Sequence, residues 1–204
     1  TRKRSSAASD VYKRQGGVNK LKKYSCKYAT SCKIILEAIE KKKLVFVYNE
    51  SVSEGGIILF TMILKALGFH SSVGNSTSDK KTFAVLTGAT GNKLNIIRQF
   101  NRDDNVEGAR INVIIGSQAV SEGVTLKNVQ VEIVQTAWFN YARIDQALAR
   151  GYRVGSHRKL PSGIIQDIYL QVAIPNKSYI LKDSFSEKED EKEDEKEDEK
   201  EDEK

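Results

Sequence analysis

The residues best suited to chemistry are three arginines and a glutamine at helical spacing: Arg143, Gln146, Arg150 and Arg153. On a helix that turns about 100° per residue, they fall within an arc of roughly 80°. The opposite side carries residues that can be buried, namely Ile144, Ala147, Leu148 and Tyr152. Guanidinium groups are planar, permanently charged and weakly hydrated, so this face is suited to gripping phosphate. The same pattern is also typical of a solvated basic helix face, and the preceding segments must decide between the two.

Polar residues also collect after three apolar runs that have the length of buried strands, residues 44–48, 83–86 and 111–115. The three following loops are residues 49–53, 87–91 and 116–123. Their glycines and small residues let backbone N–H groups approach an anion, and their hydroxyl groups add donors. On neighbouring parallel strands, the loops would form one phosphate-contacting rim. Each loop taken singly is also explained by the preference of turns for Gly, Ser and Asn.

The elements that must position these residues alternate between strands and helices. The periodicity predicts helices over residues 29–42, 53–67 and 93–100, followed by the basic helix, which Asn140 caps. Strands are expected over residues 44–48, 83–86, 111–115, 129–134 and 164–174. This alternation predicts an α/β fold with a mostly parallel sheet and helices on both faces, whose ligands bind beyond the carboxyl ends of the strands. On helix 93–100, the residues expected in the core are Leu94, Ile97 and Phe100.

Charge is distributed very unevenly along the 204 residues, whose overall net charge is +6. Glu187–Lys204 repeats acids and lysines with a period of four and carries a net charge of −8. Without apolar residues this tail cannot bury anything, so we expect residues 183–204 to be disordered. Residues 5–15 resemble a translated sequencing adapter, and residues 1–15 are therefore set aside as not native. The remaining residues 16–186 have a net charge of +10, which favours a polyanionic partner such as nucleic acid.

Domain organisation follows from these boundaries: a leading helical region over residues 16–43 and one domain over residues 44–182. Cys26 and Cys32 are not accompanied by further Cys or His residues at the spacing of a zinc site, so free thiols and no metal site are expected. No apolar run approaches 18 residues and nothing resembles a signal peptide, which predicts an intracellular protein without a membrane span. Because Thr1 is not a start methionine, we expect a piece of a longer reading frame.

Three motifs in order carry a family resemblance: Val113–Leu126 (VIIGSQAVSEGVTL), Trp138–Asn140 (WFN) and Arg143–Gly155. Together they resemble the second RecA-like domain of superfamily 2 helicases, over roughly residues 24–182. The segment Gly155–Pro161 (GSHRKLP) is similar to the large-DNA-virus branch, which includes poxvirus-type early transcription factors and nucleoside-triphosphatase helicases. One departure is Ala149, which stands where many relatives have glycine.

The resemblance implies roles for particular residues. Arg150 and Arg153 would be arginine fingers for ATP held by a neighbouring domain, with Gln146 orienting them or touching the phosphate. Glu122 and Gly123 would lie on the nucleotide side of their loop. Contacts to the nucleic-acid backbone, DNA or RNA, would come from Ser51, Thr87, Gly88, Ser117 and Ser121.

The chain lacks the motifs that bind a triphosphate and its magnesium. It contains no Gly-x-x-x-x-Gly-Lys-Ser/Thr and no Asp-Glu-Ala-Asp or Asp-Glu-x-His, and the Gly88–Lys93 segment has the wrong spacing for a phosphate loop. We therefore expect ATP with Mg²⁺ to be bound mainly by an N-terminal RecA-like domain of the parent chain, and this chain to be inactive alone. Two alternatives remain open: a non-enzymatic nucleic-acid-binding module, and a protein-interaction domain whose acidic tail recruits a basic partner.

Overall fold

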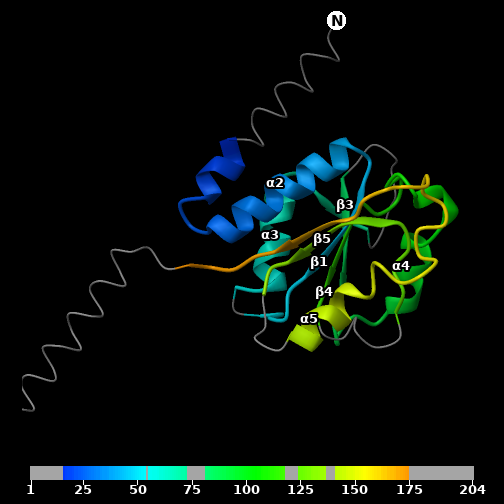
Figure 1. The fold of residues 1–204 in the computed structure, drawn as a ribbon. Helices are drawn as coiled ribbons and strands as arrows, with labels where there is room; N and C mark the ends of the chain where they lie inside the picture. The colour runs from blue at the N-terminus through cyan, green and yellow to red at the C-terminus, as the bar shows by residue number, and fades with distance from the viewer. Residues whose placement is uncertain (1–15, 54, 73–80, 118–123, 137–140, 175–204) are drawn as a thin grey trace, which may run out of the picture. The chain divides into compact units, whose positions relative to one another are not determined.

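A computed structural model describes residues 16–53, 55–72, 81–117, 124–136 and 141–174 (Figure 1). The adapter-like head and the acidic tail lie outside these residues. The described sheet has six strands, all parallel, in the order β2-β3-β4-β1-β5-β6. Their bounds are β1 Leu44–Tyr48, β2 His70–Ser71, β3 Thr82–Leu86, β4 Val113–Gly116, β5 Val129–Val134 and β6 Asp167–Leu170. The predicted α/β class is confirmed.

Helices cover both faces of this sheet, as predicted. Their bounds are α2 Cys26–Glu40, α3 Ile57–Ala66, α4 Lys93–Phe100 and α5 Tyr141–Leu148, with a helical segment over residues 16–21 and a 3₁₀ turn at Asp103–Asn105. In Figure 1, α2 and α3 lie together on one side of the strands, and α4 and α5 lie on the other. None of the described helices has the length and apolar character that crossing a membrane requires.

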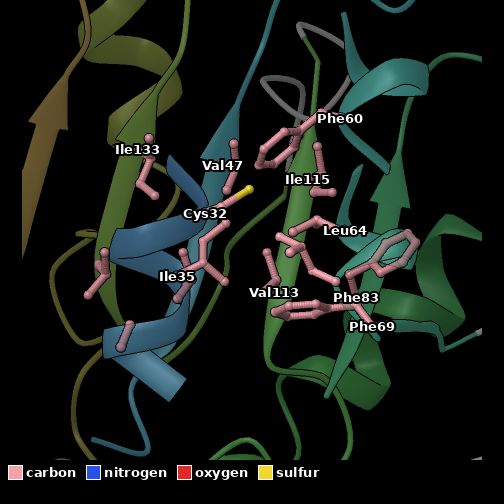
Figure 2. Packing of buried hydrophobic residues seen from close by; sticks show 14 of the residues in the cluster. Cys32, Ile35, Val47, Phe60, Leu64, Phe69, Phe83, Val113, Ile115 and Ile133 are labelled. Carbon is pink, nitrogen blue, oxygen red and sulfur yellow. The ribbon is translucent and has the colours of Figure 1, made fainter. Parts of the chain in front are cut away.

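Each face of the sheet buries its own apolar cluster. Beneath α2 and α3, Cys32, Ile35, Phe60 and Leu64 pack on side chains of the central strands such as Val47 (Figure 2). The second cluster packs α4 and α5 on the same strands from the other side. Because both faces are covered, β1 is buried along its whole length, which explains its unbroken apolar sequence.

The predictions for α4 and for the last strand each need a correction. Leu94 is 71% exposed, and the buried positions of α4 are Ile96 and Phe100, which are four residues apart and face the sheet together. The last strand is shorter than expected, because only Asp167–Leu170 pairs with β5. The sheet and its helices belong to one compact unit that ends at Val172.

The turn between β1 and α3 requires glycine at position 56. A Cβ atom there would lie 2.0 Å from the backbone oxygen of Ser51, which also accepts a hydrogen bond from the Ile57 amide at 2.9 Å. Gly56→Ala should therefore lower the free energy of unfolding by about 1–3 kcal/mol through overpacking, as urea denaturation would measure. The control is Gly91→Ala, where nothing lies within 4 Å of the added carbon. Equal stabilities of the two variants would refute this account of the turn.

Candidate functional site

The ends of three adjacent strands bring predicted nucleic-acid contacts to one edge of the sheet. The register aligns Gly116 with both Tyr48 and Leu86, so β4, β1 and β3 end level with one another. The Ser117 amide donates to the Leu86 carbonyl at 3.1 Å, which holds two of the following loops side by side. We call this edge the rim, and its predicted contact residues within the described part are Ser51, Thr87, Gly88 and Ser117.

The residues of the rim differ in their exposure to solvent. Ser51 and Gly88 are exposed, whereas Thr87 and Ser117 are buried. The Thr87 amide donates to Thr90 Oγ1 at 3.0 Å, and the Thr90 hydroxyl donates back to the Val85 carbonyl at 3.2 Å. This bonding closes a tight turn in which Gly88 is exposed. Ser121, Glu122 and Gly123 lie outside the described residues, so their predicted roles stay predictions.

A buried amide network, which sequence reasoning missed, supports the rim from below. Asn49 Nδ2 donates to Gln135 Oε1 at 3.1 Å, and Gln135 Nε2 donates to Ser31 Oγ at 2.9 Å. Asn49 Oδ1 accepts from the Ser51 amide at 3.0 Å and from Thr136 Oγ1 at 2.9 Å. Since Asn49 and Gln135 are almost fully buried and both their amide nitrogens and oxygens are hydrogen-bonded, they fix the backbone that carries Ser51. The sequence signal that could have identified Asn49 and Gln135 is that each directly follows a strand that is apolar enough to be buried.

A cavity of about 240 Å³ opens beside this network. It is lined by Ser25, Lys27, Tyr28, Asn49, Ser51, Gly55, Gly56, Gln135 and Thr136. The Tyr28 hydroxyl donates to the Gly55 carbonyl, and its ring stacks on Phe60 at a centroid distance of 5.3 Å. Burial raises the pKa of Tyr28, which further favours the protonated form of this hydroxyl. The hydroxyl and amide groups of the lining are chemically compatible with a sugar–phosphate backbone.

The predicted basic helix is shorter than expected, and this corrects its geometry. Helix α5 ends at Leu148, so Arg150 and Arg153 lie in the following turn and not on the helix. The Gly151 amide donates to the Leu148 carbonyl at 2.9 Å, and the Arg150 carbonyl accepts from the Leu126 amide, also at 2.9 Å. This second bond draws the chain out of the helical path. We call residues 149–157 the arginine turn.

The apolar side of α5 is mostly as predicted, with one error. Ile144 and Ala147 are buried, and Leu148 packs against the same cluster. Tyr152 is 38% exposed, because the turn carries it away from the sheet. Its hydroxyl donates to Asp145 Oδ1 at 2.6 Å, and this bond is the main reason that the pKa of Tyr152 is raised to about 12. Asp145 is therefore engaged by a neutral phenol.

The two guanidinium groups of the turn have few protein partners. Arg153 Nη1 donates to Thr125 Oγ1 at 3.1 Å, and Arg150 Nε is buried without a hydrogen-bond partner. Within the described residues, neither arginine forms an ion pair. Burial, and then the nearby charge of Arg153, lowers the pKa of Arg150. Two close cations with spare donors form a site whose natural partner is an anion.

The arginine turn does not lie at the rim. Its bonds to Thr125 and Leu126 place it beside the segment that enters β5, and Asn101, at the end of α4, donates to the Thr125 carbonyl at 2.8 Å. The predicted residues thus form two separate groups, one at the carboxyl ends of the strands and one near the entry to β5. Gln146 is exposed on α5.

Glu132, in the middle of β5, was not singled out from the sequence. It is 0% exposed, and its carboxyl accepts one hydrogen bond, from Gln166 Nε2 to Oε1 at 2.6 Å. Its Oε2 atom is buried without a partner. Burial raises the pKa of Glu132 to about 8. The sequence signal that could have identified Glu132 is the presence of an acid inside the largely apolar run VQVEIV.

Candidate metal ligands do not gather in the part of the chain that the structure describes. Within the described ranges, no group of three or more His, Cys, Asp or Glu side chains could hold an ion. His157, for instance, is committed to the fold: its Nε2 lies 2.5 Å from the Val129 carbonyl and its Nδ1 lies 2.9 Å from Ser156 Oγ.

Comparison with known proteins gives consistent matches. The sequence matches the family described as "Helicase conserved C-terminal domain" over residues 26–155. It is 35% identical over 166 residues to "Putative helicase 009L" of Frog virus 3 (isolate Goorha), covering 80% of this chain and 17% of that protein. It is 33% identical over 147 residues to "Nucleoside triphosphatase I" of Melanoplus sanguinipes entomopoxvirus, covering 70% and 20%. Among solved structures, it is similar to the C-terminal part of the Fun30 ATPase domain, with a TM-score of 0.46 and 22% identity over 70% of this chain and 40% of that one.

Proposed function

Because the chain belongs to the helicase conserved C-terminal domain family, we propose that it is the C-terminal half of an ATP-dependent nucleic-acid helicase or translocase. The observation that carries this proposal is the arginine turn. Two close guanidinium groups lack carboxylate partners within the described residues, and Arg150 keeps a buried, unbonded Nε–H. The chain spans 17–20% of the length of the two relatives above, so the remaining machinery belongs to the parent protein.

In this proposal, Arg150 and Arg153 act as arginine fingers. They reach toward ATP that the N-terminal RecA-like domain holds, and they stabilise charge on the transferring phosphoryl group. Gln146 orients them or touches the phosphate, and Glu122 and Gly123 face the nucleotide. The arginine turn fits a phosphate group, whereas the described residues offer no carboxylate cluster for Mg²⁺, so the N-terminal domain would supply the magnesium ligands.

The rim supplies the contacts to the nucleic-acid strand. Ser51, Ser117 and Ser121 are the proposed serine contacts, and the exposed Gly88 offers its backbone amide to phosphate oxygens, whereas the Thr87 amide is held by Thr90. The net charge of +10 over residues 16–186 supports binding to DNA or RNA. The acidic tail, at −8, is proposed to recruit a basic partner, which a pull-down with and without Glu187–Lys204 would detect.

The decisive experiment compares this chain with the complete parent protein. The complete protein should hydrolyse ATP faster when single-stranded nucleic acid is added, because both halves of the site are present. The 204-residue chain alone should show no turnover above background. Measurable turnover by the purified chain would contradict the proposal that hydrolysis needs both RecA-like domains. A complete protein without ATPase activity would favour a non-enzymatic nucleic-acid-binding module.

A further inference from the structure

The buried carboxyl of Glu132 lies directly against the arginine turn. A Cβ atom built on Gly151 would lie 1.9 Å from Glu132 Oε1 and 2.8 Å from its Cδ. The carboxyl therefore occupies the space that any side chain at position 151 would need. Gly151 is the residue immediately after Arg150, so Glu132 contacts the backbone at the point where this arginine leaves the turn.

Hydrogen bonds hold the backbone on both sides of this contact. The Arg150 carbonyl accepts from the Leu126 amide at 2.9 Å, and the Gly151 carbonyl accepts from Ser156 Oγ at 3.2 Å. Glu132 is itself held by Gln166, whose Nε2 donates to Oε1 at 2.6 Å. The turn is thus fixed at two carbonyls and supported at the Cα between them.

Packing alone does not account for a carboxyl at this place. Glu132 is fully buried and its Oε2 has no hydrogen-bond partner, which costs free energy that a hydrocarbon side chain would avoid. The neighbouring positions of β5, Val131 and Ile133, are apolar and equally well buried. The two atoms nearest to a Cβ built on Gly151 both belong to Glu132, and the third is the Cβ of Val129.

We propose that Glu132 is a positioning residue for Arg150: its carboxyl, held by Gln166, supports Gly151 and sets the direction in which the Arg150 side chain leaves the turn. This inference rests on the proposed function, in which Arg150 acts on ATP. Glu132 does not touch the nucleotide and acts only through the backbone. Its contribution should therefore appear in the catalytic rate and not in nucleotide affinity.

The test measures steady-state ATP hydrolysis by the complete protein for four variants. Glu132→Ala should lower kcat about ten-fold or more and leave KM for ATP within about two-fold, because misplacement of a catalytic group by about 1 Å has effects of this size. Glu132→Gln should retain kcat, since its amide oxygen still accepts the bond from Gln166 and fills the same space. Gln130→Ala, at another buried polar position of β5, is the matched control and should be unchanged. Arg150→Ala should lose turnover.

These outcomes separate the two proposals. If Arg150→Ala retains turnover, the proposed function itself fails. If Arg150→Ala loses turnover while Glu132→Ala retains it, or if Glu132→Gln loses as much as Glu132→Ala, the positioning role alone is overturned.

A second measurement guards against a simple folding defect. Hydrogen exchange of the Arg150 Nε–H, followed by NMR in the 204-residue chain, should be slow in the natural protein and in Glu132→Gln, and faster in Glu132→Ala. Thermal melting of the same samples shows whether the variants are folded. Unchanged exchange in a folded Glu132→Ala variant would also overturn the positioning role.

Discussion

Replacing Arg150 with alanine should lower kcat for ATP hydrolysis by the complete protein by about 10³-fold or more, and leave nucleic-acid affinity within about three-fold. Arginine fingers typically contribute 10³–10⁵ in rate, which is roughly 4–7 kcal/mol of transition-state stabilisation. The structure also indicates that the lost activity would not come from unfolding. The Arg150 guanidinium forms no ion pair within the described residues, so its loss leaves no buried carboxylate there unpaired and should not unfold the turn.

The matched control is Arg158→Ala, which removes the same charge from an exposed position of the same segment. Its turnover should stay within about two-fold of the natural protein, as expected for an exposed charge. Steady-state kinetics give kcat, and fluorescence anisotropy with a labelled oligonucleotide gives affinity. If Arg150→Ala instead abolishes binding with little loss of turnover, the arginine holds the nucleic acid and the non-enzymatic alternative gains support.

Glu132→Gln should raise the free energy of unfolding by about 3 kcal/mol at pH 7. Burial raises the pKa of Glu132 from its ordinary value of 4.5 to about 8, so the folded protein binds a proton that the unfolded chain releases at neutral pH. This group's contribution to stability is fully present below pH 4.5 and is lost as the pH rises toward 8. Since each pKa unit corresponds to 1.36 kcal/mol, the cost at pH 7 is about 3 kcal/mol. Glutamine is neutral throughout and avoids this cost.

Urea denaturation at pH 5, 6, 7 and 8 would measure this difference between the variant and the natural protein. The stabilisation should be small at pH 5 and largest at pH 8, because only the natural protein loses stability over this range. Glu37→Gln, at an exposed position of α2, is the control and should change stability by less than about 0.5 kcal/mol at every pH. A difference that does not vary with pH would show that Glu132 titrates normally.

The elements predicted best were those with a clear apolar pattern in the sequence. Strands β1 and β5 and helix α4 have the predicted bounds, because their apolar residues are continuous or recur at helical spacing. The comparisons also confirm the resemblance to helicases and nucleoside triphosphatases of large DNA viruses. Among the strands that the structure describes, the two-residue β2 is too short to leave a periodic signal.

The errors occur where distant contacts override local pattern. The arginines continue the helical spacing of α5, but the bond from the Leu126 amide and the carboxyl of Glu132 against Gly151 end the helix earlier. Neither contact can be read from periodicity, since the partners lie about 20 residues away in the sequence. The same holds for the Asn49–Gln135 pair, whose members are 86 residues apart. The assignment of site residues therefore still depends on the experiments above.

The amide network beneath the rim also has a direction. Asn49 donates to Gln135, Gln135 to Ser31, Ser31 Oγ to Gln171 Oε1 at 3.0 Å, and Gln171 to the Lys27 carbonyl at 3.4 Å. Every link donates forward, so the bond dipoles align head to tail and strengthen one another. This chain of bonds begins at Asn49, in the loop after β1, passes through Gln171, which follows β6, and ends at the Lys27 carbonyl in α2. The loop that carries Ser51 is therefore joined, through buried side chains, to helix α2 and to the residue after β6.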